Sequence, residues 1–402
     1  MKRREFIQKS ALTTVGSMLI PNFLKAYELE HLITNNNLNG KILVVIQLSG
    51  GNDGLNTIIP YQNDLYYQNR PALGIKKENL ISLNDELGLN AVMGGLKKIY
   101  DQGYLSIINQ VGYPNPDRSH FRSMDIWHTA SASNQYLSTG WLGRYLDAQC
   151  QQNCTSAHMA IEVDDSLSLA LKGDKIKGLA MTQPDKLYKN TQDKQIKTLA
   201  TYPHKHEKDE NVAYLYKTLA ETVSSAQWIY EKAKITASKA TYPENDFAKR
   251  LKTIASLIIS GLETQVYYVS LGSFDTHTNQ KAQQERLLKI YADAVDVFVN
   301  DLKNNQKWNQ VAIMTFSEFG RRVAQNASGG TDHGTANQVF LMAEKLKKAG
   351  FYNPAPNLTD LDEGDLKYSI DFRNIYAALL QQHLQVEPKT VLNQNFEPLA
   401  LL

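Results

Sequence analysis

The chain has very little cysteine. Cys150 and Cys154 are the only two in 402 residues. No second pair exists to complete a four-cysteine zinc site, so that class of metal site is excluded. Two interpretations of the pair stay open. In an oxidising compartment a local disulfide is plausible, whereas in a helix the two side chains would merely face the same way and their geometry could forbid a bond.

An excess of charge of one sign is also missing. The 43 Lys and Arg residues nearly balance 41 Asp and Glu residues, which gives a formal net charge of +2. No dense basic run follows the N-terminus, so nothing indicates a nucleic acid partner. No repeat of fixed period is visible. The length exceeds the range in which one core usually keeps growing, so we expect one large domain with insertions or a main domain with a smaller cap.

Long apolar runs are absent as well. The segment 10–21 near the N-terminus is weakly apolar and too short to span a bilayer as a helix. It follows a charged stretch with Arg3, Arg4 and Phe6, and Ala26 stands at a possible cleavage point, which together look like a twin-arginine export signal. We therefore expect residues 1–26 to be a signal peptide and the mature chain to be periplasmic or on the cell surface. A basic amphipathic start to a cytoplasmic domain is the alternative.

What the sequence does contain is an alternation of strand and helix patterns from residue 40 to residue 402. Apolar, β-branched runs predict strands at residues 41–48, 105–112, 159–163, 265–271, 311–314 and 339–342. Helical spacing of apolar residues predicts helices at residues 91–100, 121–129, 140–146, 221–233, 247–258, 280–303 and 371–384. This alternation indicates an α/β fold with a mostly parallel sheet. The polar stretch 164–245 is expected to be an insertion or lid, and the tract from Tyr61 to Pro71 a loop.

Chemically competent side chains follow the predicted strands. In α/β proteins ligands sit at the carboxyl ends of parallel strands, so these side chains should converge. They are Asp53 after the first strand, Arg118, Ser119 and His120 after the second, Asp275 and His277 after 265–271, and Glu318, Arg321, Arg322, Asp332 and His333 after 311–314. Each of them alone could be a cap, a turn residue or a core polar group.

Together these residues predict a metal site. Asp53, Asp275, His277, Asp332 and His333 offer carboxylate and imidazole ligands, which suit one or two divalent ions such as Zn, Mn, Mg or Ca. The glycines 329 and 330 would let the last pair fold back toward the strand ends. Glu318 is the nearest candidate in sequence to accept a hydrogen bond from the second nitrogen of His333, and His120 is also expected behind the ligands.

The serine before the second helix has two interpretations. Ser119 could cap the helix, the commoner case, or it could be a nucleophile activated at a helix N-terminus, with Ser123 in reserve. Arg118, Arg321 and Arg322 could clamp the oxygens of a phosphoryl or sulfuryl group, or could be ordinary surface arginines.

Several motifs carry a family resemblance. They are the Arg-Arg-Glu-Phe start, Leu-Ser-Gly-Gly-Asn-Asp-Gly-Leu-Asn at 48–56, Arg-Ser-His-Phe at 118–121, Gly-Trp-Leu-Gly-Arg at 140–144, Phe-Asp-Thr-His at 274–277, Ser-Glu-Phe-Gly-Arg at 317–321 and Gly-Thr-Asp-His-Gly at 330–334. The set resembles the exported domain of unknown function 1501 family over nearly the whole chain. The order of the site residues is similar to that in the alkaline phosphatase and sulfatase superfamily. The resemblance implies the fold and leaves the activity open.

The chain departs from the active members of that superfamily. Asp275 and His277 are one residue apart, where the cofactor-independent phosphoglycerate mutases have three between. The third histidine expected for a second ion has only His383 as a later candidate, although Glu318 or His120 could substitute. No Cys-x-Pro-x-Arg stretch of the formylglycine sulfatases is present.

Two functions remain. The first is an exported metal-dependent hydrolase of phosphate or sulfate esters, acting on a small-molecule or glycan ester. The other is a catalytically degenerate, surface-associated binding or assembly protein on the same scaffold.

Overall fold

The computed structural model describes residues 40–149, 157–201 and 210–402. The expected signal peptide at 1–26 and both cysteines, Cys150 and Cys154, lie outside the described residues. Among the residues that are described, no helix has both the length and the apolar character needed to cross a membrane.

The centre of the molecule is a nine-stranded sheet with the order β11-β5-β10-β9-β1-β8-β6-β7, and β14 also pairs with β5. The middle strand β1 (Ile42–Leu48) is buried along its whole length and pairs in parallel with β8 (Val266–Leu271) and β9 (Val311–Phe316). The continuous apolar run predicted this, because a parallel strand is covered on both faces. Two short parallel strands, β6 (Ala160–Glu162) and β7 (Leu179–Ala180), extend the sheet beyond β8.

One strand runs against the others. β10 (Asn337–Ala343) lies antiparallel between β9 and β5 (Leu105–Gly112). Since β10 opposes both neighbours, β5 points in the same direction as β9 and β1. The α/β class with a mostly parallel sheet is therefore confirmed, and the carboxyl ends of β5, β9, β1 and β8 share one edge.

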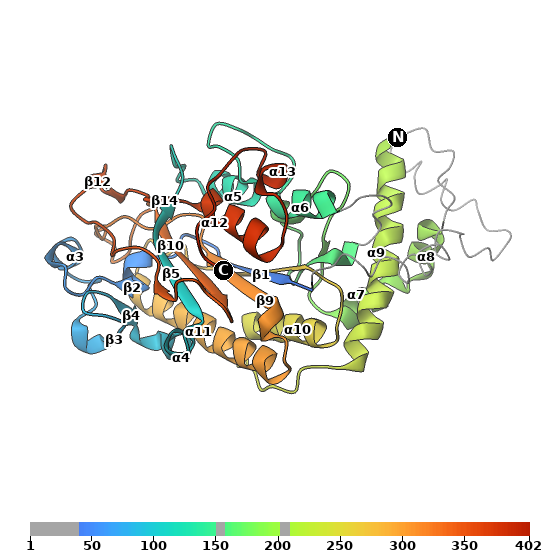
Figure 1. Ribbon diagram of the computed structural model, residues 1–402, viewed down its shortest axis with the longest axis horizontal. Coiled ribbons are helices and arrows are strands. Elements are labelled where there is room, and N and C mark those ends of the chain that lie inside the picture. Colours follow the sequence, from blue (N-terminus) through green and yellow to red (C-terminus); the bar gives the residue numbers. More distant parts are fainter. Residues whose placement is uncertain (1–39, 150–156, 202–209) are drawn as a thin grey trace.

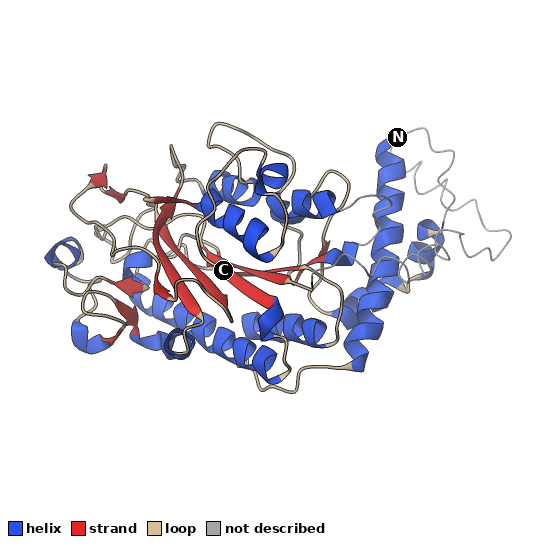
Figure 2. Cartoon of the chain, in the orientation of Figure 1, coloured by secondary structure: helices blue, strands red, loops and turns tan. Residues whose placement is uncertain are grey.

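Helices cover both faces of the sheet (Figures 1 and 2). One core contains Val44 and Ile46 of β1, and the other contains Leu43 and Val45, as the two-residue period of a strand requires. The first face is covered by α4 (Gly94–Asp101), α10 (Asp246–Ile259) and α11 (Gln280–Asn304). The second is covered by α5 (His120–Thr129), α6 (Trp141–Gln149), α12 (Phe372–Ala378), a π-helical turn (Leu379–His383) and α13 (Pro388–Leu392).

The structure corrects two local predictions. The tract 61–71 is not only a loop, because α3 (Asp64–Asn69) forms there, with the Asn63 side chain accepting a hydrogen bond from the Leu65 N–H at its start. The strand at 339–342 is not the last one. It is followed by β11 (Gly350–Phe351), the β12 (Leu361–Asp362) and β13 (Asp365–Leu366) hairpin, and β14 (Ile370–Asp371). A small sheet of β2 (Ile58–Ile59), β4 (Gly88–Asn90) and β3 (Leu80–Ser82) lies beside α3.

The polar segment 164–245 contributes α7 (Pro184–Thr191), α8 (Lys194–Ala200) and the long α9 (Glu210–Ile235). α9 packs on α7, α8 and α10, at the right of Figure 1 beyond the β7 edge. The strands that deliver the predicted site residues lie further along the sheet.

Candidate metal centre

The predicted site residues come together at one edge of the sheet. The loops after β5, β8 and β9 deliver His120, Asp275 and Glu318. The loop that enters β10 delivers Asp332 and His333, because an antiparallel strand begins where its neighbours end. In that loop the N–H of Gly320 donates to the carbonyl of Thr335 at 2.8 Å. This hydrogen bond holds the segment that enters β10 against the segment that leaves β9.

A close approach of two loops requires glycine at position 330. A Cβ built there would lie 2.3 Å from the carbonyl carbon of His277, which no side chain permits. Gly329, with φ of +69°, makes the turn that precedes it. The glycine pair therefore brings the segment of His333 against the segment of His277, as the sequence predicted.

Three imidazole nitrogens converge on the carboxylate of Asp275. The Nε2 atoms of His277 and His333 lie 3.0 and 3.1 Å from Asp275 Oδ1, and they lie 3.0 Å from each other. The Nε2 atom of His120 lies 3.4 Å from Asp275 Oδ2. One ligand atom each from His120, Asp275 and His333 lie within 4.8 Å of one another. Ligand atoms around a tetrahedral zinc ion are about 3.3 Å apart, so the spacing fits one ion.

Each of the three rings is fixed from behind through its other nitrogen. His333 Nδ1 donates to the carbonyl oxygen of Arg118 at 2.8 Å. His120 Nδ1 lies 2.9 Å from Glu318 Oε1, and His277 Nδ1 lies 3.3 Å from Asp332 Oδ1. Histidines that bind a metal have this arrangement, in which a carbonyl or carboxylate acceptor sets the tautomer and the ring orientation.

The tautomers have an electrostatic consequence. With the proton on Nδ1, each neutral ring directs an Nε2 lone pair toward a carboxylate and toward its neighbours. Such a cluster of acceptors needs a cation or additional protons. The carboxylates of Asp275, Glu318 and Asp332 contact these rings or their neighbours, and a divalent ion would add positive charge among them. The donor set therefore fits a divalent metal.

The contacts within the cluster also shift the pKa values of its members. Partial burial raises the pKa of Asp275, but the hydrogen bond from Arg321 and the neighbouring imidazole of His333 outweigh this and bring it to about 2. The hydrogen bond from Asn326 lowers the pKa of Asp332. The hydrogen bond to Glu318 raises the pKa of His120. Both aspartates are thus anionic at neutral pH.

Asp53 is held in a different environment. Its carboxylate is fully buried and paired with Arg70, whose Nη1 lies 2.6 Å from Oδ2. Gln280 also donates to Oδ2, while Oδ1 has no hydrogen-bond partner in the described part of the chain. Arg70 is itself fully buried and donates to Asn56 as well. The structure therefore supplies Asp53 with an internal cation.

Arg321 has a structural role instead of the substrate contact predicted for it. The side chain is buried, and its nitrogens donate to carbonyl oxygens of Gly50, Gly51 and Thr331 and to Asp275 Oδ1. It ties the loop after β1 to the loops after β8 and β9. A residue used in this way does not face a substrate.

Arg118 and Arg322 are more accessible, with side chains 39% and 38% exposed. Both approach the buried carboxylate of Asp365 in β13. Arg118 donates to Oδ2, and Arg322 Nε lies 3.7 Å from Oδ1. Two partly exposed guanidiniums therefore flank one buried anion beside the segment of Ser119.

The two serines differ. Ser119 occupies the N-cap position of α5 and is exposed, yet its hydroxyl makes no capping hydrogen bond. Ser123, the reserve nucleophile, is fully buried and donates to the Glu318 carbonyl at 2.7 Å. Burial removes Ser123 from consideration, while the hydroxyl of Ser119 is free of a structural task.

Three other residues differ from their predicted places. Glu318 contacts His120 and does not serve His333, whose Nδ1 is bound to Arg118. His120, predicted behind the site, faces Asp275, while Asp332, predicted as a ligand, lies behind His277. His383 is a packed histidine whose Nε2 bonds to the Ile42 carbonyl at 2.9 Å, and burial lowers its pKa to about 4.

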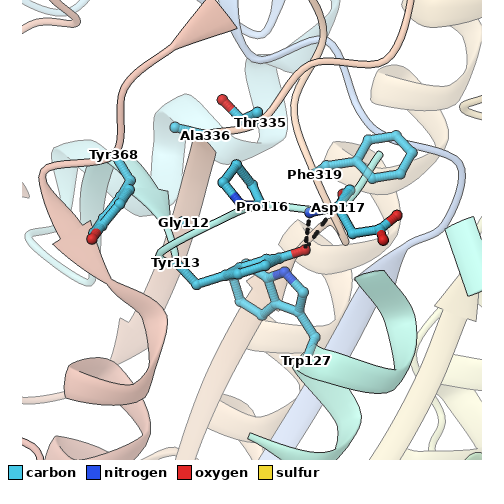
Figure 3. Close-up of a pocket in the computed structure, with 9 residues that line it drawn as sticks. All are labelled: Gly112, Tyr113, Pro116, Asp117, Trp127, Phe319, Thr335, Ala336 and Tyr368. Atoms are coloured by element: carbon cyan, nitrogen blue, oxygen red, sulfur yellow. Dashed lines mark hydrogen bonds between the residues drawn. The ribbon is translucent and has the colours of Figure 1, made fainter. Parts of the chain in front are cut away.

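A small apolar cavity lies next to the segment of Ser119 (Figure 3). Tyr113, Trp127 and Phe319 are among its lining residues, and the Tyr113 hydroxyl bonds to the backbone of Asp117. Its volume is about 10 Å³, which is enough for one water and too little for a substrate.

A family model described as "Protein of unknown function (DUF1501)" matches residues 104–381. The chain belongs to this family. The DUF1501 match contains the three histidines that contact Asp275, whereas Asp53 lies before it. No curated protein matched the chain.

Solved structures that the chain resembles include three examples. A protein in the alkaline phosphatase superfamily from Vibrio parahaemolyticus is 9% identical, with 89% of this chain and 70% of that chain covered and a TM-score of 0.40. The PsFucS1 sulfatase from Pseudoalteromonas sp. is 11% identical, with 95% and 77% covered and a TM-score of 0.38. The C-terminal periplasmic domain of EcEptC from Escherichia coli, in complex with Zn, is 9% identical, with 76% and 73% covered and a TM-score of 0.35.

Sequence reasoning missed two residues of this edge. Arg70 belongs to the tract that the sequence predicts to be a loop, and none of the motifs includes Asp365. The position of Arg70, after a tract of tyrosines and at the end of α3, could have indicated its burial. Asp365, in an exposed-looking acidic stretch, carries no such signal.

Proposed function

We propose that the chain is an exported, metal-dependent hydrolase of phosphate or sulfate esters. The observation that supports it most is the arrangement around Asp275, in which three rings are fixed through Nδ1 and present Nε2 to one point. His120, His277, His333 and Asp275 would hold a divalent ion. When bound, such an ion polarises an ester oxygen and neutralises charge that develops on it.

Ser119 is the nucleophile in this proposal. It precedes His120, and its exposed hydroxyl is not occupied by capping. Attack by Oγ on phosphorus or sulfur forms the new ester bond and releases the alcohol, which takes up the hydroxyl proton. Water then hydrolyses this seryl ester, which releases phosphate or sulfate and restores the serine hydroxyl. The free N–H groups in the first turn of α5 favour an anion at this position.

Arg118 and Arg322 would orient the ester group. Their guanidiniums are partly exposed and are directed toward Asp365. An incoming dianion competes with this carboxylate for the same donors, and bidentate contacts to its oxygens would fix its orientation.

One observation favours the second candidate function, a binding protein without turnover. Arg70 neutralises Asp53, so the position that would help to hold a second ion already contains a cation. The chain would then use one ion, either for a one-metal reaction or for stability and binding only.

The test is a paired measurement on the purified mature chain. Metal content is determined by mass spectrometry, and hydrolysis is assayed with phosphate monoesters, phosphate diesters and sulfate esters in the presence of Zn, Mn, Mg or Ca. The hydrolase proposal expects one ion per chain and turnover that falls at least a hundredfold in Ser119→Ala. Ser138→Ala, at another exposed serine, is the matched control. Absence of turnover, with one bound ion or none, would overturn the hydrolase and support the binding protein.

A further inference from the structure

A second, larger cavity opens beside the segment of Ser119. Its volume is about 400 Å³, within the range of roughly 300–1,000 Å³ of small-molecule sites. Asn115 and Asp117 line it from one loop, Ser133 and Asn134 from another, and the buried Arg373 contributes as well. None of these residues belongs to the cluster around Asp275.

The cavity is connected to the proposed nucleophile through one hydrogen bond. The backbone N–H of Ser119 donates to Asp117 Oδ1 at 2.7 Å. The two loops are also tied to each other, because Ser133 Oγ donates to the Pro114 carbonyl at 3.1 Å. Arg122 donates to the carbonyls of Ser133 and Gln135 and so fixes the second loop on α5. The walls therefore have a defined position relative to Ser119.

The lining is polar and includes the carboxylate of Asp117. Asn115 and Asn134 make no side-chain hydrogen bond within the part of the chain that the structure describes, and both are exposed. The charge of Arg373 is neutralised by Asp371, with Nη2–Oδ2 and Nε–Oδ1 distances of 2.5 and 2.9 Å. Amide groups with free donors and acceptors recognise hydroxyl groups. A hydrocarbon chain would leave them unpaired.

The second of these loops continues to an exposed aromatic ring. Tyr136, two residues after Asn134, is 76% exposed and has the guanidinium of Arg122 over its ring at 3.8 Å. An aromatic ring that is held by a cation and otherwise open to solvent is a platform for the C–H face of a ring-shaped ligand.

We propose that this cavity binds the sugar ring of a carbohydrate phosphate or sulfate ester, that is, the alcohol released by Ser119. The inference rests on the proposed hydrolase function and names its substrate class. Asn115 and Asn134 bond to the sugar hydroxyls, and Tyr136 covers one edge of the ring.

The experiment compares two kinds of ester. p-Nitrophenyl phosphate and sulfate lack hydroxyl groups for the two amides, whereas hexose 6-phosphate and 6-sulfate carry them. In Asn134→Leu, kcat/KM for the hexose esters should fall about tenfold more than for the p-nitrophenyl esters, mainly through KM, because a hydrogen bond and its partner are lost. Asn309→Leu, at an exposed asparagine before β9 and thus at the opposite edge of the sheet, should leave the ratio unchanged.

Equal losses on both kinds of ester, or no loss, would overturn the sugar site while the hydrolase stands. If neither kind of ester is hydrolysed, the hydrolase proposal fails, and calorimetric titration of hexose 6-sulfate decides about the cavity. Binding to the wild type that weakens in Asn134→Leu supports the site. Absence of binding to the wild type rejects it.

Discussion

The buried pair of Asp53 and Arg70 allows a quantitative prediction. Replacing Arg70 by Met keeps most of the side-chain volume and removes the cation. Asp53 would remain fully buried, with its charge unpaired. The hydrogen bonds to the carbonyls of Arg322 and Val323 would be lost too. Removing one partner of a buried ion pair costs about 3–5 kcal/mol, a large share of the roughly 5–15 kcal/mol that stabilises a folded protein.

The assay is urea denaturation of the wild type, Arg70→Met, Asp53→Asn and the double variant. We expect the double variant to be more stable than Arg70→Met by about 2 kcal/mol, because the amide that replaces the Asp53 carboxylate carries no charge to leave unpaired in the core. A loss below about 1 kcal/mol in Arg70→Met would refute the assignment of a buried, mutually dependent pair.

The same variants test whether Asp53 can bind a metal. If it can, Zn added to Arg70→Met should restore stability, since an ion that binds only the folded state stabilises it. Zn should then have no such effect on the double variant. Restoration in neither variant would show that Asp53 acts only as the partner of Arg70.

Three further predictions concern other parts of the chain. Asp332→Asn should weaken metal affinity about 10–100-fold without abolishing it, because Asp332 positions His277. Competition with a chelating dye measures this affinity, and an unchanged affinity would contradict the prediction. Burial lowers the pKa of His128 from 6.5 to about 4, so between these pH values the unfolded state binds a proton that the folded state does not bind. Up to about 3 kcal/mol of stability is therefore lost as the pH falls from 6.5 to 4. His128→Gln should flatten this decline in urea denaturation; an equal slope would reject the explanation. Changing Arg3 and Arg4 to Lys should trap the precursor inside the cell, as cell fractionation would show, because the export receptor reads the arginine pair, and unaltered export would refute the signal.

The sheet could be predicted because apolar runs in the sequence mark its central strands. β1 and β9 are almost entirely apolar, and the polar residues that follow them had to meet at one edge. α3 was missed because its tyrosines do not form an obvious apolar stripe and its stability comes from the cap at Asn63 and from burial of Tyr66. Tertiary packing decides such a segment.

The membership of the site was easier to predict than the roles within it. The motifs brought His120, Asp275, His277, Asp332 and His333 together. Which of these side chains points toward Asp275 depends on the backbone path of a few residues, such as the turn at Gly329. Spacing in the sequence does not determine such a path. His120 and Asp332 therefore exchanged their expected places. Arg70 entered from a distant segment, which local patterns do not reveal.

The long sequence separation across the site edge has a consequence for folding. Hydrogen bonds such as Gly50 N–H to Glu318 and Asn52 N–H to Ser317 join segments 268 and 265 residues apart. Such contacts form late, because a long chain must first close on itself. Until β9 has been synthesised, one edge of the apolar strand β1 has no partner and can template pairing with another chain. A chain cut short before residue 311 is thus expected to self-associate, and the side chains around Asp275 can assemble only in a chain that extends past His333.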